Sequence, residues 1–304
     1  MTTSQQTPQL GLVCITASQE IRFRTTTRTQ LMRLSTAEQA AKLAAIYRYN
    51  LDRLSHALSF CLSYGIRLYR ISSDIFPFAD TPQGKDTLAS FHAELWRTGQ
   101  RALDAGMRLV FHPDQFVVLS SDSPTVVANS ITILQMHAEI MDLLGQPRSA
   151  WATVEIHGGK AGRAEQLVNV IRTLPEGIRS RLALENDESA YSAGEILEIC
   201  RAAGVPMVFD AHHHIVHEQL DTYEHLSIGE MVTASRGTWP HPQWQLVHIS
   251  NGRAAFADRR HADLITAMPT AYRTVPWIEI EAKQKEVAIF KLQQEWLSVA
   301  TGKA

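Results

Sequence analysis

The sequence has little of what marks secreted, membrane or nucleic-acid-coating proteins. Its 304 residues include only three cysteines, Cys14, Cys61 and Cys200, whose odd number and wide spacing favour buried thiols in a reducing cytoplasm over disulfides. No apolar run approaches the ~18 residues of a membrane span, and the polar residues 1–9 lack the charged and apolar regions of an export signal. The 29 basic and 31 acidic residues give a formal net charge of -2, which excludes a protein that coats a polyanion by bulk positive charge. We therefore expect a cytoplasmic protein that does not bind membranes.

Eight short apolar runs predict parallel strands, because the interval between successive runs always leaves room for a crossover helix. The runs are Leu10–Thr16, Arg67–Ser73, Arg108–Asp114, Thr153–His157, Arg181–Asn186, Pro206–Asp210, Gln245–Ser250 and Trp277–Lys283. No Gly-x-Gly-x-x-Gly motif follows any run, which disfavours a doubly wound open sheet. We predict an α/β protein, a single (β/α)8 TIM barrel over residues 1–304, with a flexible segment at 1–9, an irregular insertion at Gln19–Arg33 and a C-terminal helix at 287–304.

Serine motifs predict where several of the intervening helices begin. In three of them a glutamate follows the serine three residues later, and in the fourth a proline follows directly: they start at Ser35, Ser192, Ser227 and Ser123. Gly65 and Gly145 are placed to end the first and second long helices in left-handed turns.

The sequence is rich in histidine, with 13 residues, and six consecutive predicted strands end in a histidine or a carboxylate. Because the carboxyl ends of barrel strands meet at one rim, these side chains should converge there. Converging carboxylates repel one another and imidazoles lose solvation unless a cation lies between them, so we predict a metal centre. The candidate ligands are His112, His157, Glu185, Asp210, His213, His248, His261 and Glu281, although the run Asp210-Ala-His-His-His does not itself show which of its imidazoles binds.

The reaction is not decided by this set of residues. Mixed imidazole and carboxylate ligands suit zinc, manganese or iron, and eight ligands suffice for two or three ions. Such a centre can cleave a phosphate diester, but it can equally isomerise a sugar. Histidines inside helical patterns, such as His137, we expect to be surface or packing residues.

The motifs resemble, in order, those of the UV damage endonucleases, over residues 10 to 286. They are Leu-Tyr-Arg-Ile-Ser-Ser73, Phe-His112-Pro-Asp-Gln115-Phe, Ile-His157-Gly-Gly, Leu-Glu185-Asn-Asp-Glu, Asp210-x-x-His213-His, Val-His248-Ile-Ser and Ile-Glu281-Ala-Lys-x-Lys-Glu. The resemblance implies a DNA repair enzyme that hydrolyses the phosphodiester bond immediately 5′ to UV photoproducts, cyclobutane pyrimidine dimers and 6-4 photoproducts, in double-stranded DNA. Endonuclease IV, an abasic-site enzyme, is a more distant relative, so abasic-site cleavage remains an alternative beside sugar isomerisation.

The resemblance also implies roles for individual residues. It implies two or three divalent ions, most often Mn²⁺ with Zn²⁺ or Mg²⁺ as alternatives, held by the eight candidate ligands, and it selects His213 from the histidine run. We expect Glu185, as a bridging carboxylate, with His112, Glu281 and Lys283 at the catalytic centre. Gln115 and Phe116 fall where the family places an amide and an aromatic that wedge into the duplex and fill the gap left by the lesion.

Two positions depart from the family pattern. Leu246 stands where a lysine close to the metals is expected, and Thr16 stands near a lesion-side position that is usually Asn. Thr16 is therefore an expected lesion contact of altered chemistry. For the DNA backbone we expect contacts from Arg22, Arg24, Arg28, Arg253 and Arg260, in a monomer that needs no obligatory protein partner.

Overall fold

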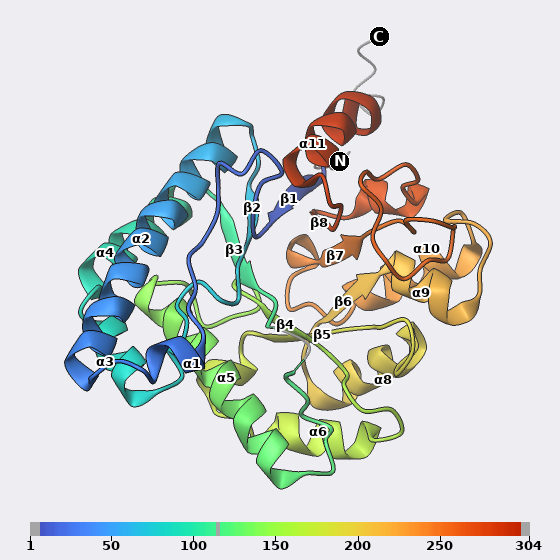
Figure 1. The fold of residues 1–304 in the computed structure, drawn as a ribbon. Coiled ribbons are helices and arrows are strands. Elements are labelled where there is room, and N and C mark those ends of the chain that lie inside the picture. Colours follow the sequence, from blue (N-terminus) through green and yellow to red (C-terminus); the bar gives the residue numbers. More distant parts are fainter. Residues whose placement is uncertain (1–6, 114–115, 299–304) are drawn as a thin grey trace.

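Eight parallel strands pair in chain order and β8 pairs with β1, so the sheet closes into a barrel (Figure 1). The structure is a computed structural model that describes residues 7–113 and 116–298. The strands are β1 (Gln9–Val13), β2 (Leu68–Ile71), β3 (Arg108–Phe111), β4 (Val154–His157), β5 (Leu182–Glu185), β6 (Met207–Asp210), β7 (Leu246–Ile249) and β8 (Trp277–Ile280). Each predicted run overlaps one of these strands, which confirms the (β/α)8 barrel.

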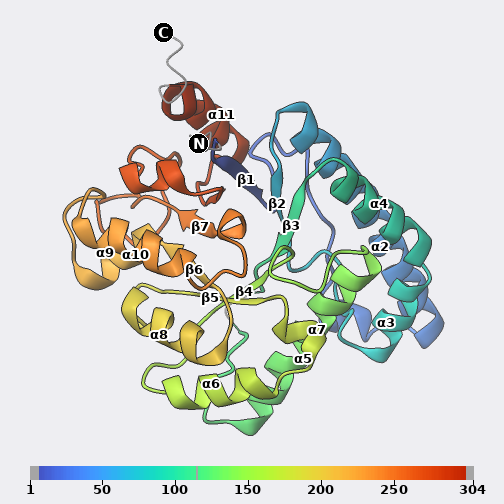
Figure 2. The same cartoon turned by 180° about the vertical axis from the view of Figure 1, so that it is seen from behind.

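Helices surround the barrel on its outside, as the two opposite views show (Figures 1 and 2). They are α1 (Arg28–Leu31), α2 (Thr36–Ser63), α3 (Pro82–Ala89), α4 (His92–Asp104), α5 (Pro124–Leu143), α6 (Ala164–Thr173), α7 (Glu176–Arg179), α8 (Ala193–Ala203), α9 (Ala211–Glu218), α10 (Leu226–Arg236) and α11 (Lys285–Leu292). Short 3₁₀ turns lie at Pro242–Trp244 and Thr270–Thr274, and a π-helical turn at Gln293–Leu297 continues α11. Among the described residues no helix is long and apolar enough to cross a membrane.

The local signals for helix ends hold in most places. Ser35 and Ser192 each form a capping box with the glutamate three residues later, and Gly65 and Gly145 have φ of +68° and +64°. Ser227 is not a cap: α10 begins two residues earlier than a cap at Ser227 would place it, because the His225 imidazole accepts the amide hydrogen of residue 227 and takes the capping position.

Three of the predicted segment boundaries differ from the structure. Gln9 already belongs to β1, so the terminal segment is shorter than residues 1–9. The insertion at Gln19–Arg33 contains one helical turn, α1, which Thr27 caps. The last α-helix begins at Lys285 instead of residue 287 and ends at Leu292, before the π-helical turn.

The barrel interior is layered, because alternate residues of each strand point inward. At the amino end the guanidinium of Arg108 is buried among tryptophans. Above it lies an apolar layer, to which Leu68, Val110, Ala183, Val208 and Leu246 belong. The carboxyl end holds buried carboxylates and imidazoles instead. Leu246, which stands where the family pattern has a lysine, is thus a fully buried member of the apolar layer, two residues before His248.

Candidate metal centre and the rim around it

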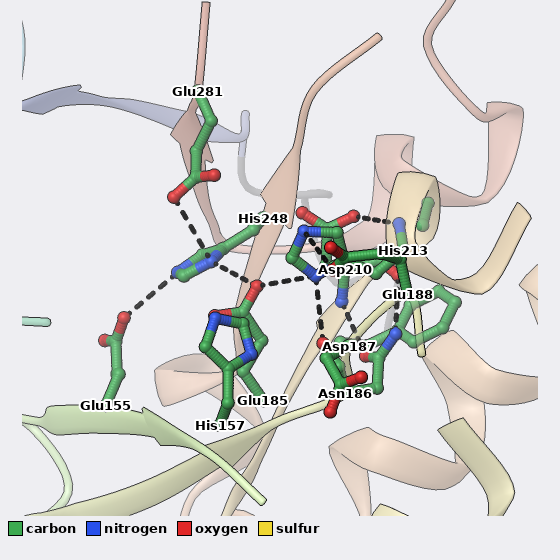
Figure 3. A network of polar contacts seen from close by, with 12 residues as sticks. Glu155, His157, Glu185, Asn186, Asp187, Glu188, Asp210, His213, His248 and Glu281 are labelled. Carbon is green, nitrogen blue, oxygen red and sulfur yellow. Dashed lines mark hydrogen bonds and ion pairs between the residues drawn. The ribbon is translucent and has the colours of Figure 1, made fainter. Parts of the chain in front are cut away.

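Six of the eight candidate ligands lie in the last two residues of a strand or directly after it, and Figure 3 shows five of them inside the carboxyl end of the barrel: His157, Glu185, Asp210, His248 and Glu281. Glu185 lies at the centre. One of its carboxylate oxygens, Oε2, is 2.8 Å from Nε2 of His112 and 3.7 Å from Nε2 of His157. The other, Oε1, is 3.1 Å from Nδ1 of His248 and 3.3 Å from Nδ1 of His213. A single buried carboxylate therefore faces four imidazoles that come from four different strand ends.

The turn after β6 selects one histidine of the 212–214 run. Asp210 caps α9 by accepting the amide hydrogen of His213 at 2.7 Å. In this turn His213 faces Glu185 and its Nδ1 lies 2.9 Å from the carbonyl oxygen of Asn186, which leaves Nε2 available to a metal. His212 and His214 bond elsewhere, to Tyr223 and Ser227. The geometry thus supports the choice of His213.

The polar atoms at the centre of this cluster lack hydrogen bonds, which is what a metal site requires. In the described part of the chain, buried atoms without a hydrogen-bond partner include Nδ1 of His157, Oε1 of Glu185, Oδ2 of Asp210 and Nδ1 of His248. Buried polar groups are nearly always paired, so four unpaired ligand atoms in one place call for a further partner. Imidazole nitrogens and carboxylate oxygens are ligands of Zn²⁺ and Mn²⁺, and the residues present therefore fit divalent ions.

Neighbouring charges shift the pKa values of several groups in the cluster. Burial by itself would raise the pKa of Glu185, but the imidazoles of His248 and His157 and the hydrogen bond with His112 hold it well below its usual range. Burial by itself would lower the pKa of His248 and of His213, yet the surrounding carboxylates raise both well above the ordinary value. An imidazole that ligates a metal is neutral, so divalent ions must displace protons on binding here.

A deeper layer of charges supports the cluster, and sequence reasoning missed it. Nε2 of His248 lies 3.0 Å from Glu155 and 2.9 Å from Glu279, while its Nδ1 faces Glu185. Arg70 bonds Glu279 at 2.8 Å and Glu281 at 2.6 Å. One signal could have found both carboxylates: each stands two residues before a predicted ligand on its own strand, and residues at that spacing share a face.

Two of the predicted site residues lie at the edge of the cluster or outside it. Nε2 of His261 is 3.7 Å from Oε2 of Glu281, so this histidine could add a ligand at the edge only. Lys283, expected at the catalytic centre, is exposed. Lys285 lies deeper instead. Burial lowers the pKa of its amine although the Glu281 carboxylate acts to raise it, and its backbone adopts a left-handed φ of +42°.

The expected lesion contacts have different fates. Gln115 lies outside the described residues, and Phe116 is 74% exposed beside a cleft of about 500 Å³ that is also lined by His112, Arg70 and Cys14. Thr16 is fully buried, and its hydroxyl accepts the amide hydrogen of Ile21 at 2.9 Å. This side chain therefore holds the loop after β1 together, and its expected contact with a lesion is not supported by the structure.

The arginines expected at the DNA backbone lie in two loops. In the first loop, Arg22 is partly buried, Arg28 is exposed, and Arg24 stacks on Tyr49 with 3.7 Å from its guanidinium carbon to the ring centroid. In the loop after β7, Arg253 is exposed and Arg260 pairs with Asp258 at 2.8 Å. Both loops follow the carboxyl ends of strands, so these arginines lie on the same side of the barrel as the metal centre.

Comparison with known proteins assigns the chain to a family. Residues 8–302 match the model of the family UV-endonuclease UvdE. Among curated relatives, the UV DNA damage endonuclease of Nostoc sp. is 55% identical over 292 residues, which cover 95% of this chain and 91% of the relative. The UV DNA damage endonuclease of Deinococcus radiodurans is 49% identical over 290 residues, which cover 94% and 95%.

Solved structures agree with this assignment and with the fold. The crystal structure of SacUVDE superposes with a TM-score of 0.76 at 26% identity and covers 94% of this chain and 98% of that one. A D-tagatose 3-epimerase-like protein matches with a TM-score of 0.58 at 12% identity, covering 97% and 99%, and at that identity it shows the barrel fold alone. The fold is therefore shared with sugar epimerases, but the sequence is not: the chain belongs to the UV-endonuclease UvdE family.

Proposed function

We propose that this protein is a UV DNA damage endonuclease that hydrolyses the phosphodiester bond immediately 5′ to a photoproduct, using two or three divalent ions. Membership of the UvdE family supports the substrate. The observation that carries the metal dependence is the group of unpaired buried ligand atoms around Glu185. A sugar isomerase would share the barrel and a metal, but no relative reported above with more than 30% identity is one.

Four groups of three residues bring their ligand atoms within 4.8 Å of one another. One of them, Glu155, His248 and Glu279, lies in the deeper layer, and the other three consist of predicted ligands: His112, His157 and Glu185; Glu185, Asp210 and His213; and Asp210, His248 and Glu281. Neighbouring groups share a carboxylate, so Glu185 and Asp210 are the residues that would bridge adjacent ions. Three groups linked in this way support a centre of up to three ions, with Mn²⁺, Zn²⁺ or Mg²⁺ as the candidates.

The chain's own residues would position the substrate for this chemistry. Bound divalent ions would offset the charge of the scissile phosphate and make water a competent nucleophile at neutral pH. The exposed Arg28 and Arg253 can contact flanking phosphates, and such contacts make binding weaken as salt rises. The cleft of about 500 Å³ beside His112 and Phe116 is open to a displaced nucleotide.

The deciding assay is cleavage of a duplex that carries one cyclobutane dimer, in the presence of Mn²⁺. We expect a single cut 5′ to the dimer that leaves a 3′-hydroxyl, and no cut in the undamaged duplex. Glu185→Gln should lower the rate by more than about 100-fold, above the loss typical of residues that only support metal ligands. Glu165→Gln, which changes an exposed carboxylate on α6, is the matched control and should cleave at the wild-type rate.

Two outcomes would contradict the proposal. Cleavage of an abasic duplex with none at the dimer would assign the protein to the abasic-site enzymes. Turnover of a ketose or aldose with no cleavage of DNA would assign it to the isomerases. Elemental analysis of the purified protein, alongside the assay, identifies the ion and its number per chain, and fewer than two ions would contradict the multinuclear centre.

A further inference from the structure

The loop after β7 is closed on itself. Gly252 bridges His261 in antiparallel fashion, and the amide of Arg253 donates to the carbonyl oxygen of Arg260 at 2.8 Å. A Cβ at Gly252 would lie 2.0 Å from a carbonyl oxygen of the same loop, so only glycine fits there. Residues 252–261, called the β7 loop below, therefore form a tightly folded unit that ends at the edge of the metal centre.

Asp258 and His212 hold the β7 loop in place. The carboxylate of Asp258 accepts two amide hydrogens of the loop, from residues 254 and 260, each at 3.0 Å. Nε2 of the buried His212 lies 2.9 Å from the carbonyl oxygen of Asp258, and it must carry the hydrogen because a carbonyl only accepts. Nδ1 of His212 lies 2.7 Å from the hydroxyl oxygen of Tyr223. The loop is thus anchored to α9, the helix that also presents His213 to the metal centre.

The β7 loop presents an aromatic ring to solvent. Phe256 is 42% exposed and makes a T-shaped contact with Tyr223 at 5.4 Å between ring centroids. The loop carries three exposed arginines and one aspartate: Arg253, Arg259, Arg260 and Asp258. A loop that carries both an exposed apolar ring and exposed arginines is suited to stack on bases while the arginines contact phosphates.

Phe256 lies across the metal centre from Phe116. In a closed barrel of eight strands in chain order, β3 and β7 are four strands apart, so the loops that follow them stand on opposite sides of the rim. Phe116, 74% exposed, is on the loop after β3, and Phe256 is on the loop after β7. A duplex that crosses the metal centre therefore meets an exposed aromatic ring on each side.

We propose that Phe256 is a second base-stacking residue, which contacts the damaged duplex on the side of the metal centre opposite Phe116. This inference rests on the proposed endonuclease function and deepens it. The bonds of Asp258 and His212 fix the loop before DNA arrives, so little conformational entropy is lost when the ring is inserted between bases.

The test is single-turnover cleavage of the dimer duplex in Mn²⁺ at increasing enzyme concentration. The half-saturating enzyme concentration reports binding, and the rate at saturation reports the chemical step. Stacking of one base on an aromatic side chain contributes ~1–3 kcal/mol, so Phe256→Ala should raise the half-saturating concentration by about 5- to 150-fold. Phe256→Trp should restore tight binding. Trp96→Ala removes a ring of similar exposure, 46%, on α4 and should leave both parameters unchanged.

A second measurement excludes a merely structural effect. Duplexes with 2-aminopurine at successive positions on either side of the dimer should show one position where fluorescence changes on binding of the wild type but not of Phe256→Ala. Gly252→Ala, which keeps the ring but disrupts the loop, should weaken the same signal. Equal half-saturation and equal 2-aminopurine signals for the wild type and Phe256→Ala would overturn the inference. Failure of the wild type to cleave the dimer would overturn the proposed function instead.

Discussion

The two ends of the barrel interior both bury charge, but they satisfy it in opposite ways. At the amino end, the guanidinium of Arg108 donates to the carbonyl oxygens of Trp151, Trp244 and Ala150 at 2.7, 2.7 and 2.8 Å. The rings of Trp151, Trp239 and Trp277 surround it, with centroids 5.2 to 5.7 Å from the guanidinium carbon. At the carboxyl end, Glu185 and Asp210 each keep a buried oxygen without a hydrogen bond.

The difference separates an end whose polar groups are satisfied within the fold from an end whose residues fit metal ions. Burial lowers the pKa of Arg108 to about 10, so the guanidinium stays charged at neutral pH. Carbonyl oxygens accept hydrogen bonds from its N–H groups, and aromatic rings surround it. That end is complete without any ligand. The carboxyl end keeps buried imidazole and carboxylate atoms without a hydrogen bond, and these atoms fit divalent ions. Substitutions at the two ends should therefore affect different measurements.

The largest effect on stability is expected at the amino end. Arg108→Met leaves three buried carbonyl oxygens without donors, and breaking a buried charged network in this way typically costs about 3–5 kcal/mol. We expect the free energy of unfolding, measured with urea, to fall by that amount. The dimer-cleavage rate per folded molecule should stay within about twofold of the wild type, because no metal ligand contacts Arg108.

Arg172→Met is the matched control. It removes an exposed guanidinium that bonds one carbonyl, that of Ala202, and should cost less than about 1 kcal/mol. Two results would contradict the assignment of stability to the amino end and of activity to the carboxyl end. One is an unchanged free energy of unfolding in Arg108→Met, and the other is a variant that folds normally but loses cleavage activity.

The fold could be predicted because its signals are local. Parallel strands that are buried on both faces read as apolar runs, and a capping box such as Ser35 with Glu38 is complete within four residues. The Ser227 prediction was wrong for the same reason: a second capping group, His225, stands two residues away and competes for the same amide. Strand ends also predicted which residues converge, because barrel topology alone places them at one rim.

The rest of the site could not be predicted because its partners are distant in sequence. Arg70 and Glu279 are 209 residues apart, and neither strand shows that its charge will be paired inside the barrel. Thr16 is a second case: the family resemblance implied a lesion contact, but the structure buries this side chain, whose hydroxyl accepts the amide hydrogen of Ile21. In both cases the deciding contact is made by tertiary structure.

A smaller effect, and one on metal affinity, is expected from Glu155→Gln at the carboxyl end. Two carboxylates, Glu155 and Glu279, face the same Nε2 of His248, so the imidazole hydrogen is held there and Nδ1 is presented to the metal centre. Loss of such support typically weakens metal affinity by about 10- to 100-fold. Calorimetric titration with Mn²⁺ should show this loss, and ¹⁵N spectra of the imidazoles should show a changed tautomer for His248.

The free energy of unfolding of Glu155→Gln, measured without metal, should change little, in contrast to the large loss expected for Arg108→Met. Glu286→Gln is the control, because Glu286 is also a buried carboxylate but bonds the amides of Ala17 and Ser18, outside the cluster. Its Mn²⁺ affinity should equal that of the wild type. An unchanged affinity in Glu155→Gln would mean that Glu279 alone orients His248.

The smallest effect concerns His137, a buried histidine on α5 that, unlike the ligand histidines, is already satisfied. Its Nδ1 lies 2.8 Å from the carbonyl oxygen of Ile133 and its Nε2 is 3.1 Å from the hydroxyl of Ser73, while burial lowers its pKa to about 4. Above pH ~6.5 the residue is neutral in both folded and unfolded chains and adds no pH dependence. As pH falls from 6.5 towards 4, the unfolded chain takes up a proton that the folded chain does not, so stability falls, by about 1–2 kcal/mol at pH 5.

His137→Asn should remove that part of the pH dependence. Asparagine can still donate to the Ile133 carbonyl, so the variant is expected to be less stable at pH 7 but to lose less stability between pH 7 and 5 than the wild type. Urea unfolding of the metal-free proteins at each pH measures the slope, and His92→Asn, which replaces an exposed histidine on α4, should keep the wild-type slope. Identical slopes in wild type and His137→Asn would show that the acid sensitivity of the fold comes from other buried groups, which include His212 and His214 as well as the cluster at the carboxyl end, because burial lowers the pKa of both of these histidines too.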